Sequence, residues 1–263
     1  MIYHYTSVEV LYKLLGNIPT PKIEYEKEEL FMTFRATHTL FLNDTTENNF
    51  IFTAFKQLGI TGTEISYLNR IWGERYLLSF SEKPDDLYMW NMYGNQCKGV
   101  AIGFNQEILE QYKQEKKLTS RIEWMDKCEY VNLNKLVQII KRTDEFKQFK
   151  KNREVLNPLL KLFHNCLKYK HEKYSSESEY RILLNEYIDE NYYVKDNKIV
   201  PYINVDLPLK VLIEIWLGPA TDYGRNKFSI ERILKAKVGG SAEYANVTTG
   251  FVVKKSEIPY SET

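Results

Sequence analysis

Short strand-like runs lie near both ends of the chain, and the segments between them are mainly helical in pattern. Ile2–Tyr5 marks one extreme and Asn246–Val253 the other. No strand–helix–strand unit repeats along the chain, and the phosphate-binding loops G-x-G-x-x-G and G-x-x-x-x-G-K are absent from the sequence. This distribution predicts an α+β fold built on antiparallel sheet, and it argues against a doubly wound parallel sheet.

The pattern of apolar residues predicts the elements around this sheet. After the first strand, Thr6 or Ser7 caps a helix in which Glu9 is placed for a capping box, and Gly16 ends it. A further short helix carries Leu87, Trp90 and Tyr93, and another spans 229–236. The remaining predicted strands are 76–81, 98–104, 123–130, 180–185, 202–205, 212–217 and 246–253.

Positive charge is concentrated in one part of the chain. The formal net charge is +1, but Gln111–Lys173 holds sixteen Lys and Arg against eight Asp and Glu, by count from the sequence. The region is mostly helical in pattern, so residues 1–263 are predicted to form a single domain with a helical, basic insert at about 111–173. Its charge is explained either by the solvated faces of amphipathic helices, which we favour, or by a surface for DNA or RNA.

The sequence also bears on compartment and on metal binding. It has no run of eighteen apolar residues and no secretory signal pattern, so neither a membrane span nor a membrane partner is expected. Three widely spaced cysteines make neither a disulfide framework nor a zinc pair, which predicts a reducing cytoplasm. No metal is expected, because His164 and His171 are seven residues apart, two turns along one predicted helix.

Several residues have both a structural and a functional interpretation. His4, between two tyrosines, is alone better explained as a packed ring, and Trp90 and Tyr93 have the i, i+3 spacing of core positions. Glu177 and Glu179 are two residues apart, so on a strand they share one face and repel each other unless something uses them. Neither a G-x-S-x-G elbow nor a recognisable cysteine-nucleophile motif accompanies them.

Four motifs occur in an order that is informative. They are Y-H-Y-T-S at 3–7, S-F-S at 79–81, G-V-A-I-G-F at 99–104 and E-Y-R-I at 179–182. In this order the chain resembles the H-Y-E type of the ADP-ribosyltransferase superfamily, in a divergent bacterial form. It also resembles an uncharacterised bacterial domain family associated with toxin and phage-defence loci. The resemblance covers strand-level anchors across residues 2–185 and implies split antiparallel β-sheets with flanking helices.

The resemblance implies that NAD is the substrate, and it implies roles for individual residues. His4, with Thr6 or Ser7, would hydrogen-bond a ribose hydroxyl. Trp90 falls where the family has the tyrosine that stacks on nicotinamide, with Tyr93 as its rival. Glu179 would be the catalytic glutamate, and Glu177 would position or deprotonate the acceptor. Tyr5 and Ser81 complete the cofactor-binding set, and Arg181, Arg75 and Arg35 are candidates for the pyrophosphate.

Two departures from the family pattern qualify these roles. Trp90 replaces the stacking tyrosine, and Tyr5 stands where the eukaryotic polymerases of this group usually have glycine. A further motif, Asn43-Asp44-x-x-Glu47, is explained either as a helix cap with an acidic first turn, which we favour slightly, or as an acceptor-side or adenosine-side contact.

The sequence leaves several functions open. The leading hypothesis is transfer of ADP-ribose to a macromolecule, with nucleic acid favoured and protein possible, in a bacterial toxin or phage-defence protein that could have an antitoxin or defence partner. The alternative is a non-catalytic domain that senses NAD or ADP-ribose. A metal-dependent nuclease is a third reading, and it would draw on Asp44, Glu47, Glu177 and Glu179.

Overall fold

The protein has an α+β fold in which helices flank a large, mostly antiparallel sheet, as the sequence predicts. The structure is a computed structural model that describes residues 1–19, 29–42, 47–115, 122–185, 190–238 and 251–259. The chain divides into two compact units. Unit 1 consists of residues 1–35, 79–122 and 204–263, and unit 2 consists of residues 36–78 and 123–203.

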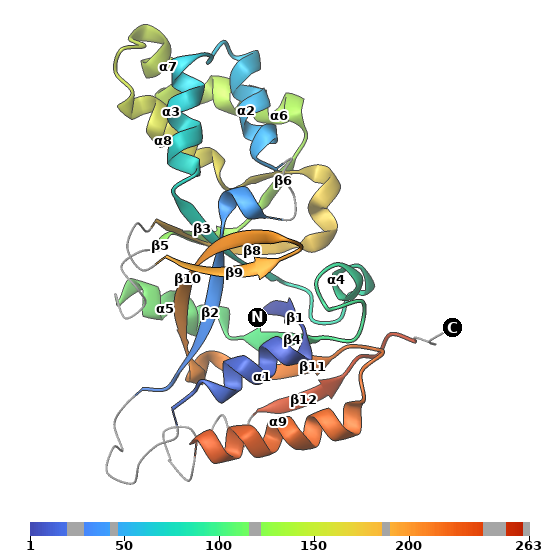
Figure 1. The fold of residues 1–263 in the computed structure, drawn as a ribbon. Helices are drawn as coiled ribbons and strands as arrows, with labels where there is room; N and C mark the ends of the chain where they lie inside the picture. The colour runs from blue at the N-terminus through green and yellow to red at the C-terminus, as the bar shows by residue number, and fades with distance from the viewer. Residues whose placement is uncertain (20–28, 43–46, 116–121, 186–189, 239–250, 260–263) are drawn as a thin grey trace. The chain divides into compact units, whose positions relative to one another are not determined.

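The strands of unit 1 place His4 in the middle of a sheet (Figure 1). β1 (Ile2–Thr6) pairs antiparallel with β4 (Val100–Phe104), with His4 opposite Ile102. The outer neighbours of β4 are β11 (Leu212–Leu217), which is antiparallel to it, and then β12 (Val252–Lys255), which is parallel to β11. On its other side β1 meets β3 (Arg75–Ser81) through Tyr3 and Ser81.

The helices of unit 1 are α1 (Val8–Gly16), α4 (Leu87–Met92), α5 (Gln106–Gln114) and α9 (Tyr223–Val238). Ser7, not Thr6, caps α1, because its Oγ accepts a hydrogen bond from Val10 N at 3.2 Å. The predicted capping box does not form, since Glu9 pairs with Lys13 at 2.6 Å. α1 and α9 contact each other, and α9 contacts β12.

The turn between α4 and β4 is tightly packed. Asn95, Gln96 and Cys97 follow one another with φ of 51°, 53° and 68°, in the left-handed region that costs L-residues free energy. A Cβ on Gly99 would lie 2.2 Å from the carbonyl oxygen of Thr6. Only glycine therefore allows this turn to pass against the end of β1.

The strands that lie wholly or partly in unit 2 form two groups. β2 (Phe31–His38) pairs antiparallel with β3, β9 (Asn191–Lys195) pairs antiparallel with β10 (Lys198–Pro208), and β8 (Glu179–Asn185) pairs with β5 (Ile122–Lys127). Separately, β6 (Glu129–Val131) and β7 (Tyr169–His171) form a two-stranded parallel sheet. The single strand predicted at 123–130 is thus two strands, β5 and β6.

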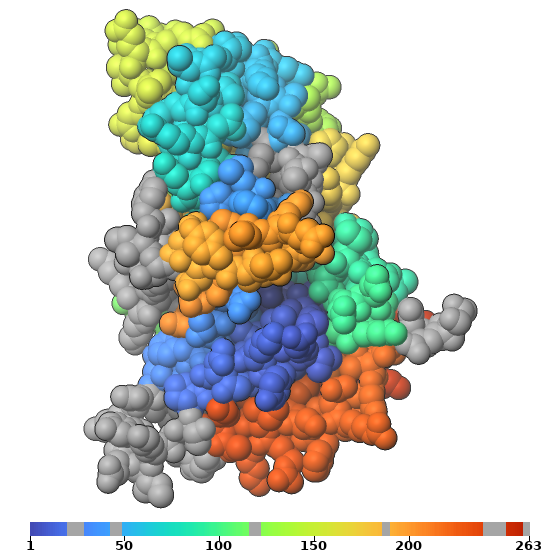
Figure 2. Space-filling model, viewed as in Figure 1, coloured from blue at the N-terminus to red at the C-terminus, as the bar shows by residue number. Residues whose placement is uncertain are grey.

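Helices gather on one side of the strands of unit 2 (Figure 1). They are α2 (Glu47–Gln57), α3 (Thr63–Trp72), α6 (Leu133–Arg142), α7 (Asp144–Lys151) and α8 (Asn157–Cys166). The space-filling view shows α2 (light blue) beside α3 (cyan) on the outer face of this unit (Figure 2). Short 3₁₀ helices complete the chain: η1 (Thr39–Phe41), η2 (Glu172–Glu177) and, in unit 1, η3 (Leu209–Val211).

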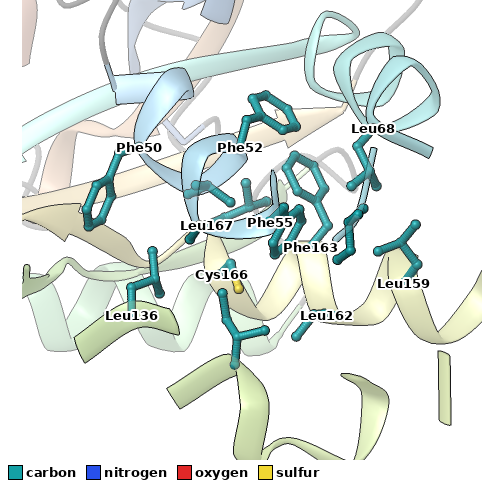
Figure 3. Close-up of a cluster of buried hydrophobic side chains, with 14 of the residues drawn as sticks. Phe50, Phe52, Phe55, Leu68, Leu136, Leu159, Leu162, Phe163, Cys166 and Leu167 are labelled. Atoms are coloured by element: carbon teal, nitrogen blue, oxygen red, sulfur yellow. The ribbon is translucent and has the colours of Figure 1, made fainter. Parts of the chain in front are cut away.

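A phenylalanine-rich core holds these helices together (Figure 3). Phe163 of α8 stacks on Phe52 of α2 at a centroid distance of 5.8 Å, and it meets Phe55 and Trp72 edge-on at 6.4 and 6.2 Å. The basic residues of α6 to α8 lie on the exposed faces of the same helices. The charge of the insert therefore has a sufficient explanation in amphipathic helices, and nucleic-acid binding stays a prediction.

Three sequence expectations concern membranes and metals. No helix of the described ranges combines the length and apolarity needed to cross a membrane. Cys97, Cys128 and Cys166 are buried and free. The placement of His164 and His171 on one helix was wrong, because α8 ends at Cys166 and His171 lies in β7.

Candidate functional site

Four buried charged side chains form a cluster in unit 2. Lys170 Nζ donates hydrogen bonds to Glu177 Oε2 at 2.5 Å and to Glu179 Oε2 at 2.8 Å. Arg181 donates from Nε to Glu179 Oε1 at 2.7 Å and from a terminal nitrogen to Glu179 Oε2 at 2.8 Å. None of the four residues is more than 6% exposed. Two cations thus neutralise two carboxylates at a place where water cannot solvate them.

The local fold explains how Lys170 reaches both carboxylates. The parallel pairing of β6 and β7 sets Tyr130 opposite Lys170, and the Tyr130 hydroxyl accepts a hydrogen bond from the backbone nitrogen of Glu179 at 2.7 Å. Glu177 ends η2, Ser178 takes a left-handed φ of 44°, and Glu179 begins β8. The prediction that both glutamates lie on one strand was therefore wrong, and Lys170 supplies the charge that their proximity requires.

Electrostatics keep Glu179 ionised. Burial alone would raise the pKa of this carboxyl, but the charges and hydrogen bonds of Arg181 and Lys170 outweigh it and hold the pKa at about 2. Burial raises the pKa of the neighbouring Tyr130 hydroxyl, so the tyrosine stays neutral. The cluster consequently presents a fixed carboxylate across the physiological pH range.

A cavity of about 380 Å³ adjoins this cluster within unit 2. Lys170 and Arg181 belong to both the cluster and the cavity wall. The other lining residues are Asn49, Phe50, Ile51, Phe52, Thr53, Trp72, Leu133, Phe163, Leu167, Tyr169, His171, Lys173 and Tyr174.

Arg75, a candidate for the pyrophosphate, lies in a separate ion pair of unit 2. Its Nε donates to Glu123 Oε2 at 2.6 Å, and a terminal nitrogen donates to Glu123 Oε1 at 2.8 Å. A second terminal nitrogen donates to the carbonyl of Ile71. The guanidinium is 4% exposed. In this conformation Arg75 serves the packing of α3 and β5.

The ion pair between Arg75 and Glu123 should make the stability of the fold decrease at acidic pH. Burial would raise the pKa of Glu123, but His164 and Arg75 outweigh it and lower the pKa to about 2. A carboxyl with a lowered pKa stabilises the fold fully above its unfolded value and loses that contribution as the pH falls through the folded value. We expect urea midpoints to fall between about pH 4.5 and pH 2, and the Glu123→Gln variant to show a shallower decline. Parallel pH profiles for the two proteins would contradict this.

In unit 1, His4 has one nitrogen engaged. Its Nδ1 lies 3.0 Å from the carbonyl oxygen of Ser79, so Nδ1 carries the hydrogen and Nε2 is the acceptor of the neutral ring. Burial lowers the pKa of His4, although the Ser79 hydrogen bond opposes the change. The ring packs edge-on against Phe34 and Phe80 at 5.3 and 5.8 Å. Among the described residues, none donates to Nε2.

Trp90 lies in the core of unit 1. It is 0% exposed, its Nε1 donates to Asp85 Oδ1 at 2.6 Å, and it packs edge-on to Tyr5 at 4.8 Å. The Tyr5 hydroxyl donates to the Lys83 carbonyl at 2.8 Å. Both rings are therefore enclosed by protein, and Trp90 has no free face on which a nicotinamide could stack. Tyr93, half-buried at the end of α4, is the more accessible of the two candidates.

The remaining predicted residues are dispersed. Ser7 caps α1, Thr6 ends β1 half-buried, Ser81 is buried at the end of β3, and Arg35 is exposed on β2. Asn43 and Asp44 lie outside the described residues, and Glu47 is the first residue of α2.

The structure thus gathers the predicted residues in two sets. Glu177, Glu179 and Arg181 meet in unit 2, whereas His4 and Trp90 belong to unit 1. Lys170 is the central residue that sequence reasoning missed. The sequence feature that could have indicated it is the triplet Y-K-H, in which the lysine lies between two aromatic residues.

Comparison with known proteins gives one match. The model of a family described as "Protein of unknown function (DUF2971)" matches residues 89–182. The matched segment runs from α4 to β8, and it includes Trp90, Tyr93, Lys170 and Glu179 but not His4. No curated protein and no solved structure matches the chain. This match to a family of unknown function agrees with the resemblance to an uncharacterised domain family. It does not test the resemblance to ADP-ribosyltransferases.

Proposed function

We propose that this protein transfers ADP-ribose from NAD to a macromolecule, in a bacterial toxin or phage-defence role. The observation that carries the proposal is the fixed, ionised carboxylate of Glu179, which follows the other three motifs in the order typical of H-Y-E ADP-ribosyltransferases. Cleavage of the nicotinamide–ribose bond develops positive charge on the ribose. A preorganised carboxylate stabilises that charge.

The proposed reaction assigns a role to each glutamate. The bond from the ribose C1′ to nicotinamide breaks, and the electron pair leaves with neutral nicotinamide. A nucleophilic oxygen or nitrogen of the acceptor bonds to C1′ and loses its proton. Glu179 stabilises the cationic ribose, and Glu177 positions the acceptor and takes that proton.

The resemblance assigns the binding groups to the first strand and to the region of α4. The Nε2 of neutral His4 accepts a hydrogen bond from a ribose hydroxyl. Tyr93 is assigned to nicotinamide stacking in preference to Trp90, because Trp90 is fully buried. Nucleic acid is the favoured acceptor, since the exposed basic residues of α6 to α8 suit a phosphate backbone.

One observation favours a second function, the sensing of NAD or ADP-ribose without catalysis. Both carboxylate oxygens of Glu179 accept hydrogen bonds from Arg181 or Lys170. A glutamate held in this way serves structure as well as it would serve catalysis. A sensor would bind the nucleotide at saturating levels and release no nicotinamide.

The two functions differ in one experiment. Purified protein is incubated with cell extract and NAD labelled in its adenylate phosphate, and nicotinamide release is followed together with label in protein, nucleic acid and free ADP-ribose. Transfer predicts nicotinamide release with label in one macromolecular fraction. Saturable binding with neither outcome would support the sensor, and the absence of both binding and release would exclude both functions.

The assigned role of His4 can be tested with a matched pair of variants. The amide of asparagine reaches the Nδ1 position, and that of glutamine reaches the Nε2 position. His4→Asn is expected to weaken NAD binding about tenfold, by loss of about one hydrogen bond, while His4→Gln keeps most of the affinity. Calorimetric titration with NAD measures both. Equal affinities, or unfolding of His4→Asn, would assign His4 to packing alone.

A further inference from the structure

The cavity of unit 2 has the size and the walls of a small-molecule site. Its volume of about 380 Å³ lies within the range typical of ligand pockets. Its walls are largely apolar rings and aliphatic side chains: Phe50 and Phe52 come from α2, Phe163 from α8, Leu167 from the residue after α8, and Leu133 from the start of α6. All lining residues belong to unit 2.

The charged residues of the wall are all cations. Lys170, Lys173 and Arg181 line the cavity, whereas Glu177 and Glu179 do not. The three cations and the two glutamates together carry a formal charge of +1 (three minus two). A negatively charged group in the cavity would therefore face cations and balance the charge that Lys173 adds beside the neutral cluster.

A buried donor in the wall lacks a partner. Trp72 lines the cavity and is 6% exposed, and its Nε1 has no hydrogen-bond partner. It is the only buried side-chain nitrogen or oxygen of the described residues in that state. Buried donors are normally paired, because an unpaired one costs about 1–3 kcal/mol.

We propose that this cavity binds a small organic anion whose body is aromatic or otherwise apolar. The rings of α2 and α8 enclose the body, and the cations at Lys170, Lys173 and Arg181 attract the charged group. The cavity shares Lys170 and Arg181 with the Glu179 cluster, whereas no residue of unit 1 lines it.

The probe for this site is 8-anilinonaphthalene-1-sulfonate, an aromatic anion whose fluorescence rises in apolar surroundings. Its uncharged counterpart, N-phenyl-1-naphthylamine, is the matched control. Fluorescence titration without NAD is expected to show one sulfonate probe per chain, bound more tightly than the uncharged probe. Tighter binding of the uncharged probe, or binding of many sulfonate probes per chain, would overturn the proposal.

Variants at exposed positions locate the probe without disturbing the core. Thr53 of α2 lines the cavity and is exposed, and Thr53→Trp is expected to weaken sulfonate binding at least tenfold by filling the space. Lys173→Gln is expected to weaken it about two- to fivefold and to leave the uncharged probe unchanged. Lys141→Gln, exposed on α6, is the control and should change neither.

Far-UV circular dichroism and the urea midpoint establish that each variant is folded. If Thr53→Trp and Lys173→Gln are folded and both bind the sulfonate probe as the wild type does, the probe lies elsewhere and the proposal fails. Because Lys173→Gln changes only an exposed side chain, it keeps the test decisive even if Thr53→Trp loses stability.

Discussion

Replacing Lys170 by methionine is expected to lower the free energy of unfolding by about 3–5 kcal/mol, the usual cost of removing one partner from a buried ion pair. Methionine has a similar volume, so the loss comes from charge and not from a cavity. Glu177 and Glu179 both lose their pair with Lys170, while Glu179 keeps its pair with Arg181, at sites no more than 6% exposed. Urea denaturation at pH 7 measures the change.

Two further proteins sharpen this expectation. Lys168→Met removes a neighbouring lysine whose pair with Glu129 is partly exposed, so it should cost less than about 1 kcal/mol. Adding Glu177→Gln to Lys170→Met removes a carboxylate that has lost its Lys170 partner and should recover part of the loss. Equal costs for the two lysine variants would show that the Lys170 cluster does not stabilise the fold.

Replacing Glu179 by glutamine is expected to lower the rate of NAD consumption by about two to three orders of magnitude, as the loss of one preorganised group commonly does. Glutamine keeps the shape of the side chain, and its one oxygen can still accept hydrogen bonds at the position of Oε2, but it carries no charge for the cationic ribose. NAD affinity should change far less than the rate, because the charge on the ribose develops only in the transition state.

The control is Glu172→Gln, a neighbouring exposed glutamate in η2, which should consume NAD at the wild-type rate. Both variants are compared below their unfolding midpoints, so that lost structure is not counted as lost catalysis. An unchanged rate in folded Glu179→Gln would reject the transferase and leave the carboxylate a structural role.

Local pattern was sufficient for much of the fold. The bounds of β11 agree with the predicted strand 212–217, because five of its six residues are apolar and Gly218 follows the last of them. β2 was missed: Met32, Phe34 and Ala36 point inward at the expected spacing, but Phe31 beside Met32 obscures the alternation. α3 was also missed, since its buried face of Ile65, Leu68 and Trp72 is sparse.

The candidate site shows a sharper limit of sequence reasoning. Two carboxylates two residues apart could be recognised as a problem of charge, and this singled out Glu177 and Glu179. Their partner Lys170 could not be recognised from the sequence. It lies in β7, which is three residues long and forms only by pairing with β6, far away in the chain. Likewise, the spacing of Trp90 and Tyr93 suits core residues and a stacking surface for nicotinamide equally well. Only their burial in the structure distinguishes the two roles.

The division of the chain has a consequence for protein synthesis. Every segment of unit 2 has been synthesised once residue 203 has been added, whereas the sheet of unit 1 still lacks β11 and β12. During translation the edge of β4 that β11 will cover has no partner, and an open strand edge is a site for mispairing. The N-terminal strand that carries His4 is therefore made first, while the sheet around it is among the last parts of the fold to be completed.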